Sequence, residues 1–372
     1  MNILLLLRTV SLKLAAITVP LLALVIGVNV YIDPANLLHD VSRSVVQELL
    51  QRRHVALLKT NIGFGEIRHT FVAMSSEKAD IAVIGSSRSL QIRSWMLPRE
   101  AIFHNLSIPN SQIETHEALY DSLKRHNYLP KTVILCVDHW LFETIQAQNI
   151  AAAAQAHSGE TSMFRLSALA EKIIPKQWLE VVSLSYFQSS LAFWRTNKSP
   201  KQFYTTLDTN DANMLILRDG GVQYSADIRH RTVEEVRNIV VMDLRRNNNK
   251  KAGDAAKFEE RGINTERKER FEAFVRRLRG DGVRCVMFLS PYHPLFYENL
   301  KSLPAVEAAF REIAQRNGLD VIGSYDPAAL GMDETDFFDY WHPTPECLAK
   351  LFGQERVRAL FTTTTITKTT TP

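Results

Sequence analysis

The chain has 372 residues, of which 45% are hydrophobic and 23% are charged, and its formal net charge is +4. These values suit one large or two smaller globular domains, and the small net charge gives no argument for nucleic-acid binding. The three cysteines are too few for a disulfide framework and have no metal-ligand spacing, and the spacing of His139, His293 and His342 with Asp138 resembles no metal motif. We expect no metal site and no cofactor. The cysteines are Cys136, Cys285 and Cys347.

The N-terminus contains an apolar run, residues 14–32, that carries no charge. Its length is about what a helix needs to cross the hydrocarbon core of a membrane. Arg8 and Lys13 precede the run and Asp33 follows it, which favours a cytoplasmic N-terminus. We therefore predict a single-pass anchor over residues 1–33 in the inner (cytoplasmic) membrane, with the remaining chain in the periplasm or outside. A cleaved signal peptide is the alternative, although no small-residue cleavage site follows the run.

Residues 34–77 are predicted to form a helical stalk, because apolar residues recur at three and four positions over 40–60. Residues 78–360 alternate short apolar runs with amphipathic helices, which predicts an α/β domain with a parallel sheet flanked by helices in three layers, flavodoxin-like. An insertion at about 145–260 is predicted to be mainly helical and contains no chemical motif. The threonine-rich end, 361–372, is of low complexity and is predicted to be disordered.

The predicted buried strands each end in polar or turn residues. They are "DIAVIGSS", "KTVILCVDHW", "VRCVMFLSP" and "LDVIGSYD". In such folds ligands bind beyond the carboxyl ends of the strands, so these ends are where we expect a functional site.

Two of these features carry complementary chemistry. Asp339 lies three residues before His342, so its carboxylate can accept the Nδ1 proton of the imidazole and leave Nε2 free as a base. Ser87, at the turn after the first predicted strand, is a weak nucleophile until such a base takes its proton. Each motif alone is weak, since a Gly-Ser-Ser turn usually only caps a helix.

Together, an early serine block and a late DxxH block on an α/β pattern resemble the SGNH (GDSL-like) hydrolase superfamily, over roughly residues 78–360. With the predicted anchor, the chain is most similar to the extracytoplasmic branch that includes alginate O-acetylation and D-alanyl transfer proteins. The resemblance implies that Ser87 is the nucleophile, His342 the general base and Asp339 its orienting acid. Ser86 replaces the aspartate that usually precedes the nucleophile.

The other blocks of the superfamily match less well. The second block supplies a glycine to the oxyanion hole, and here Ser107 or the backbone near Asn110 would have to donate instead. The third block supplies an asparagine, and here Asp138 and His139 stand in its place. A carboxylate would repel an oxyanion, whereas an inward-pointing His139 would be able to donate.

Several further residues at the strand ends are candidates for substrate contact. Arg88 adjoins the nucleophile and would bind an anionic sugar or an acetyl carbonyl, or else lie on a helix surface. His293 lies in the turn "SPYHP", which is either structural or a substrate contact. Trp140, Trp341 and Tyr340 form either a sugar-stacking wall or part of the aromatic core.

Two functions remain open at this point. The first is a membrane-anchored serine esterase or O-acyltransferase, acting on a cell-envelope polysaccharide through an acyl-serine intermediate, with a membrane-bound acyltransferase as a possible partner. The second is a catalytically inactive protein of the same fold that binds a glycan or acts as a scaffold in an envelope assembly.

Overall fold

The computed structural model describes residues 3–38, 41–58, 63–143, 176–249 and 262–362. The chain divides into two compact units. The first comprises Met1–Ser44, Leu57–Gly63 and Ala147–Tyr204, and the second comprises Val45–Ala56, Phe64–Gln146 and Thr205–Pro372. The predicted stalk and the predicted insertion each contribute residues to both units.

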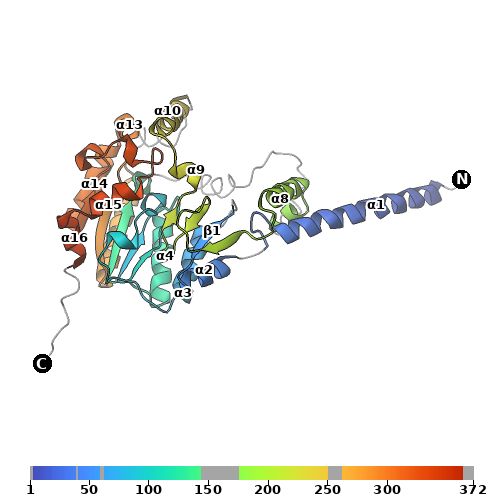
Figure 1. Ribbon diagram of the computed structural model, residues 1–372, viewed down its shortest axis with the longest axis horizontal. Helices are drawn as coiled ribbons and strands as arrows, with labels where there is room; N and C mark the ends of the chain where they lie inside the picture. The colour runs from blue at the N-terminus through green and yellow to red at the C-terminus, as the bar shows by residue number, and fades with distance from the viewer. Residues whose placement is uncertain (1–2, 39–40, 59–62, 144–175, 250–261, 363–372) are drawn as a thin grey trace. The chain divides into compact units, whose positions relative to one another are not determined.

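The first unit contains the helix that the apolar N-terminal run predicts. Helix α1 spans Ile3–Ile32, and 24 of its residues, Thr9–Ile32, are apolar enough to cross a membrane by length and composition, although a signal sequence would meet the same test. Two helices of the same unit, α7 (Lys176–Val181) and α8 (Leu184–Asn197), contact α1 (Figure 1).

The second unit is built on a five-stranded sheet with the order β3-β2-β4-β8-β9, in which every neighbouring pair is parallel. The strands are β2 (Ile81–Ile84), β3 (Phe103–Asn105), β4 (Thr132–Val137), β8 (Arg284–Leu289) and β9 (Asp320–Gly323). Numbered by their order in the chain, they run 2-1-3-4-5, which is the flavodoxin-like order. Strand order reverses between β2 and β4, and such a switch point is where open α/β sheets bind ligands.

The four predicted strands are confirmed as β2, β4, β8 and β9. Strands β2 and β4 are buried at every position, as expected where helices cover both faces of a parallel sheet. Strand β3 was not predicted, because its three residues, "FHN", do not form an apolar run.

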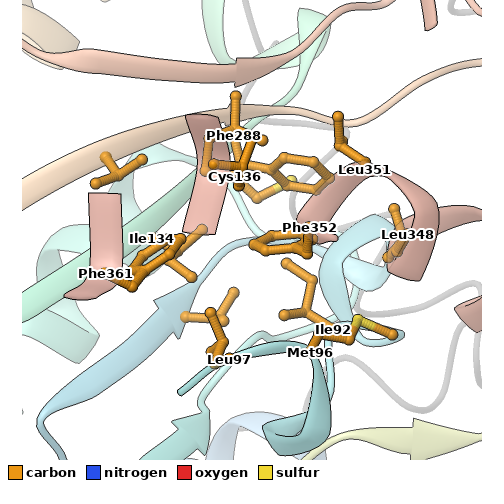
Figure 2. Packing of buried hydrophobic residues seen from close by; sticks show 14 of the residues in the cluster. Ile92, Met96, Leu97, Ile134, Cys136, Phe288, Leu348, Leu351, Phe352 and Phe361 are labelled. Atoms are coloured by element: carbon orange, nitrogen blue, oxygen red, sulfur yellow. The ribbon is translucent and has the colours of Figure 1, made fainter. Parts of the chain in front are cut away.

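One face of the sheet packs against the C-terminal helices α15 (Pro345–Phe352) and α16 (Glu355–Thr362). Figure 2 shows Phe352 among Cys136 and Phe288 of the sheet and Ile92 and Met96 of the segment after β2. The buried side chains alternate along each strand, so every second strand residue faces this cluster.

The described chain contains further helices. In the second unit, α12 (Thr265–Gly280) contacts β8 and α4 (Ile113–Arg125), and α14 (Leu303–Arg316) contacts β9. The remaining helices are α2 (Ser42–Leu50), α3 (Phe64–Met74), α9 (Ala226–Arg229), α10 (Val233–Asn249) and α13 (Pro294–Asn299).

Two sequence predictions require correction, and a third is incomplete. The helix expected over 40–60 ends at Leu50, and His54–Leu57 is strand β1; Arg52, with φ of 61°, takes a left-handed conformation that interrupts the helix. The described part of the insertion is mainly helical, as predicted, but it also contains three short strands that were not predicted: β5 (Phe203–Thr206), β6 (Met214–Ile216) and β7 (Val222–Gln223), with β6 and β7 antiparallel. The predicted tail begins too early, since Phe361 and Thr362 end α16. Residues 144–175, 250–261 and 363–372 lie outside the described chain.

Candidate functional site

Ser87 lies at the carboxyl end of β2, at the switch point of the sheet. It begins a short 3-10 helix, Ser87–Ser89, whose N-cap is Ser86: the Ser86 hydroxyl accepts a hydrogen bond from the Arg88 N–H at 3.2 Å. Position 85 requires a glycine because neighbouring side chains approach its backbone closely: a Cβ there would lie 2.5 Å from both Cys136 Cβ and Ser89 Oγ. The Gly-Ser-Ser order therefore lets the strand turn tightly against β4 and leaves the Ser87 side chain partly exposed.

His342 and Asp339 lie in the turn before α15. The Asp339 carboxylate accepts the backbone N–H groups of Trp341 and His342 at 2.7 and 2.9 Å. It also accepts the Nδ1–H of His342, at 2.8 Å to Oδ2 and 3.0 Å to Oδ1. One carboxylate thus orders both the backbone of the turn and the imidazole ring, and it fixes the tautomer in which Nε2 has no proton.

The structure brings the two predicted motifs together. His342 Nε2 lies 2.9 Å from Ser87 Oγ, although 255 positions separate the two residues in the sequence. The hydroxyl donates to the unprotonated Nε2, so serine, histidine and aspartate form one continuous hydrogen-bonded chain. The side chains of His342 and Asp339 are each 20% exposed, and Ser87 is half-buried, so the three residues lie near the protein surface.

The charge balance favours an ionised Asp339. Burial by itself would raise the pKa of this carboxyl, but the attraction of His342 and the hydrogen bonds from His342 and Trp341 outweigh it and lower the pKa below 3.8. Asp339 is therefore a carboxylate at any pH near neutrality and is able to stabilise an imidazolium at His342.

Arg88 is neither a surface residue nor open to a ligand, so both sequence interpretations of it are corrected. Its side chain is fully buried, and Nη1 pairs with Asp138 Oδ1 at 2.8 Å. Nη2 donates to the carbonyl oxygens of Ser290 and Pro291, and Nε donates to the carbonyl of Trp341 at 3.2 Å. One guanidinium thereby joins the segments after β2, β4 and β8 to the residue next to His342.

Asp138 follows β4, where the resemblance places an asparagine, and it too is fully buried. Burial raises the pKa of Asp138, and the Arg88 guanidinium opposes that rise. The guanidinium also stacks 3.5 Å from the ring centre of Tyr292. Because the carboxylate is paired with Arg88, the repulsion of an oxyanion that the sequence suggests is largely offset.

His139 is a buried neutral imidazole in an aromatic cluster. Burial and the positive charge of Arg88 lower its pKa to about 3. Its Nδ1 lies 2.7 Å from the Tyr292 hydroxyl and its Nε2 lies 3.3 Å from Glu143, so both nitrogens have partners. Its ring stacks on Trp341 with a centroid separation of 5.4 Å. His139 therefore supports the loop that carries His342 and is not free to donate to a reactant.

The aromatic wall predicted from the sequence exists in part. The rings of Trp140 and Trp341 lie 5.1 Å apart, and those of Tyr340 and Trp341 lie 5.3 Å apart. All three side chains are half-buried, so each combines core packing with an exposed edge.

Ser107, His293 and Asn110 are the remaining candidates; Ser107 does not take the role expected of it, and His293 fits the structural alternative. Ser107 is buried, and its hydroxyl pairs with Ser89 Oγ at 2.8 Å, so it is committed to packing. His293 is fully buried against the Phe337 ring, with neither ring nitrogen hydrogen-bonded within the described chain, and precedes α13. Asn110 takes φ of 56°, a conformation that favours glycine, the residue type that the resemblance places in this block.

Tyr224 is a site residue that the sequence did not reveal. Its ring lies 5.6 Å from the His342 ring, and burial followed by the Asp339 charge raises the pKa of its hydroxyl. It follows β7, whose Val222 N–H donates to the Leu90 carbonyl at 3.0 Å. No local pattern marks this tyrosine, because only the fold brings residues 205–225 back to the segment after β2.

Among the described residues, no group of three or more histidine, cysteine, aspartate or glutamate side chains is placed to hold a metal ion. Comparison with known proteins found no matching family model, no similar curated protein and no similar solved structure.

Proposed function

We propose that this protein is a membrane-anchored serine esterase or O-acyltransferase that acts outside the cytoplasm on a cell-envelope polysaccharide. The observation that carries the proposal is the hydrogen-bonded chain from Ser87 Oγ through His342 to Asp339, with 2.9 Å between nucleophile and base. A serine with a purely structural role does not require an oriented imidazole beside it. A nucleophilic serine requires a base that takes its proton, and an oriented imidazole is such a base.

The chemistry follows from the proton positions. His342 Nε2 accepts the Ser87 proton as Oγ attacks the acyl carbon of an ester, and Asp339 stabilises the imidazolium that forms. The protonated His342 then gives the proton to the departing alcohol, leaving an acyl-serine. Water, or a sugar hydroxyl, attacks this intermediate and gives its proton to His342. The bond to Ser87 Oγ then breaks, and His342 returns the proton to Ser87. Hydrolysis and transfer differ only in that second acceptor.

The negative charge that develops on the substrate oxygen needs hydrogen-bond donors. We assign this role to backbone N–H groups of Ser87 and of the turn at Asn110, because the side chains of Ser107 and His139 have other partners. The Ile108 N–H donates to the Gly85 carbonyl at 2.9 Å, which keeps this turn beside the end of β2.

The class of substrate rests on the resemblance to SGNH hydrolases and on the aromatic edges beside the site. Half-buried Trp140 and Trp341 offer flat apolar surfaces of the kind that carbohydrate rings stack on. The predicted anchor places the enzyme at the inner membrane, with a cytoplasmic N-terminus, where a membrane-bound acyltransferase would supply the acyl group.

The test is hydrolysis of p-nitrophenyl acetate by the full chain in detergent, with Ser87→Ala as the matched inactive variant. We expect turnover by the wild type and loss of at least about 1,000-fold in the variant, since the nucleophile is absent. Equal rates for both proteins would contradict the proposal. Absence of turnover together with binding of envelope glycan would favour the alternative of a catalytically inactive glycan-binding protein.

A further inference from the structure

The end of α1 that leads into the rest of the chain is held by polar contacts with α8 and the residues before it. Asn29 is fully buried, and its Nδ2 donates to the carbonyl oxygens of Val181 and Ser183 at 2.7 and 3.3 Å. Its Oδ1 accepts the Ser190 hydroxyl at 3.1 Å. The position of α8 against the last turns of α1 is thus fixed by directional bonds.

Four residues further on, Asp33 reinforces the same junction. It accepts the Tyr186 hydroxyl at 2.6 Å and the backbone N–H groups of Leu37 and Leu38, each at 2.9 Å. The apolar run therefore ends at Asn29 and Asp33, whose side chains form polar contacts with α8 and with the residues that follow α1. A helix packed on this part of α1 lies at the depth of the membrane surface if α1 spans the bilayer.

Helix α8 has three distinct faces. Tyr186, Ser190 and Phe193 are buried, and the first two of them bond to α1 or the residue after it. Ser185 and Ser189 lie on an exposed polar face. The third face is an apolar stripe at positions i, i+3, i+7 and i+10. Its members are Leu184, Phe187, Leu191 and Trp194.

The apolar stripe is open to solvent in the isolated chain. Leu184 is 63% exposed, Leu191 41% and Trp194 39%, and Phe187 is half-buried. Near the start of α8, Trp178 and Val182 are also 49% and 44% exposed. Burying a large apolar side chain contributes roughly 1.5–3 kcal/mol, so exposed residues at this spacing indicate a surface that another apolar phase covers.

The stripe is continuous with the surface of α1. The ring of Tyr31, itself 63% exposed, lies 6.2 Å from the ring of Trp194. Tyrosine and tryptophan concentrate at the two surfaces of a membrane, where an apolar ring and a polar edge are both satisfied. The exposed Arg195 and Lys198 follow Trp194, and cations at this level pair with lipid phosphates.

We propose that the apolar stripe of α8 is embedded in the headgroup–acyl boundary of the bilayer that α1 crosses. The helix then lies in the membrane surface and anchors the chain at a second point beside α1 (Figure 1). This proposal rests on the membrane anchoring proposed above and does not depend on esterase activity.

The test uses the full chain, reconstituted in vesicles of phosphatidylethanolamine and phosphatidylglycerol, with a nitroxide attached to one introduced cysteine at a time. The three native cysteines are buried, so the wild type serves as the unlabelled blank. Leu184→Cys and Leu191→Cys report on the stripe, and Ser189→Cys is the matched control on the polar face of the same helix. Leu21→Cys, in the middle of the apolar span, reports on the anchor. Power-saturation measurements compare collisions with oxygen, which enters lipid, and with a water-soluble nickel chelate.

We expect the Leu184 and Leu191 labels to lose access to the nickel chelate and to gain access to oxygen relative to the Ser189 label. Equal nickel access at Leu184 and Ser189, with Leu21 protected, would overturn the proposal and leave the anchor intact. Labels at Leu184 that neither reagent reaches would also overturn it, because protein rather than lipid would cover the stripe. Nickel access at Leu21 would overturn the anchor itself, and p-nitrophenyl acetate hydrolysis in the same vesicles reports on the enzyme independently.

Discussion

Asp339→Asn is expected to lower kcat/KM for p-nitrophenyl acetate by about 10,000-fold while the fold is retained. An asparagine keeps the size of the side chain and one oxygen for the turn N–H groups that Asp339 accepts at 2.7 and 2.9 Å. It loses the negative charge that stabilises the imidazolium of His342 and no longer enforces the tautomer in which Nε2 accepts the Ser87 proton.

The stabilisation that the Asp339 carboxylate gives to the folded chain depends on pH, and the direction of that dependence follows from the shift in its pKa. The pKa of Asp339 is lowered below 3.8 in the folded chain, mainly by His342 acting against the opposing effect of burial. The contribution of the carboxylate is therefore fully present above about pH 3.8 and is lost only as the pH falls through the lower pKa of the folded state. We expect the difference in free energy of unfolding between the wild type and Asp339→Asn to be lost in acid, as the pH falls below about 3.8.

Asp333→Asn is the matched control, because Asp333 is an exposed aspartate six residues earlier in the same block. Its carboxylate accepts hydrogen bonds from the backbone N–H and the hydroxyl of Thr335. We expect kcat/KM within about threefold of wild type. Comparable losses in the two variants would show that the Asp339 effect is not specific to the contact with His342.

Arg88→Ala is expected to destabilise the folded chain by about 3–5 kcal/mol, because it leaves Asp138 buried without its partner. The substitution also removes the donors to the Ser290, Pro291 and Trp341 carbonyls. Chemical denaturation of the full chain in detergent measures the effect. Arg276→Ala is the surface control, since Arg276 is 60% exposed and its pairing with Glu272 at 3.5 Å contributes at most about 1 kcal/mol.

A double-mutant cycle separates the ion pair from the packing around it. Arg88→Met alone leaves the Asp138 carboxylate without its partner, and Asp138→Leu alone leaves the Arg88 guanidinium without its carboxylate. Combining Arg88→Met with Asp138→Leu removes both charges and fills a similar volume. We expect the double variant to recover at least about half of the free energy of unfolding that each single variant loses. Strictly additive losses would contradict the assignment of Arg88 and Asp138 as a coupled pair.

The sheet and the contact between Asp339 and His342 were predictable because each depends on a short stretch of sequence. Strands buried on both faces read as apolar runs, as β2 and β4 do, and the spacing of Asp339 and His342 encodes their contact within one turn. The meeting of His342 with Ser87 followed from topology, since both lie at the ligand-binding edge of a parallel sheet.

The features that were missed depend on contacts between distant residues. Arg88 looks like a surface residue until Asp138, fifty positions away, is seen to pair with it inside the protein. Tyr224 reaches His342 only because the segment 205–225 folds back on the turn after β2. His54–Leu57 carries apolar residues that fit a helix or a strand, and the backbone at Arg52 decides between them.

We propose that Ser87 acts as a nucleophile activated by His342. The most direct test of this proposal is reaction of the full chain with a fluorophosphonate, followed by mass spectrometry of the peptide that contains residues 81–92. We expect one phosphonyl adduct per chain on Ser87, none on Ser86 or Ser89, and none in His342→Gln. An unmodified Ser87, or an adduct that forms equally fast without the imidazole, would contradict the proposal.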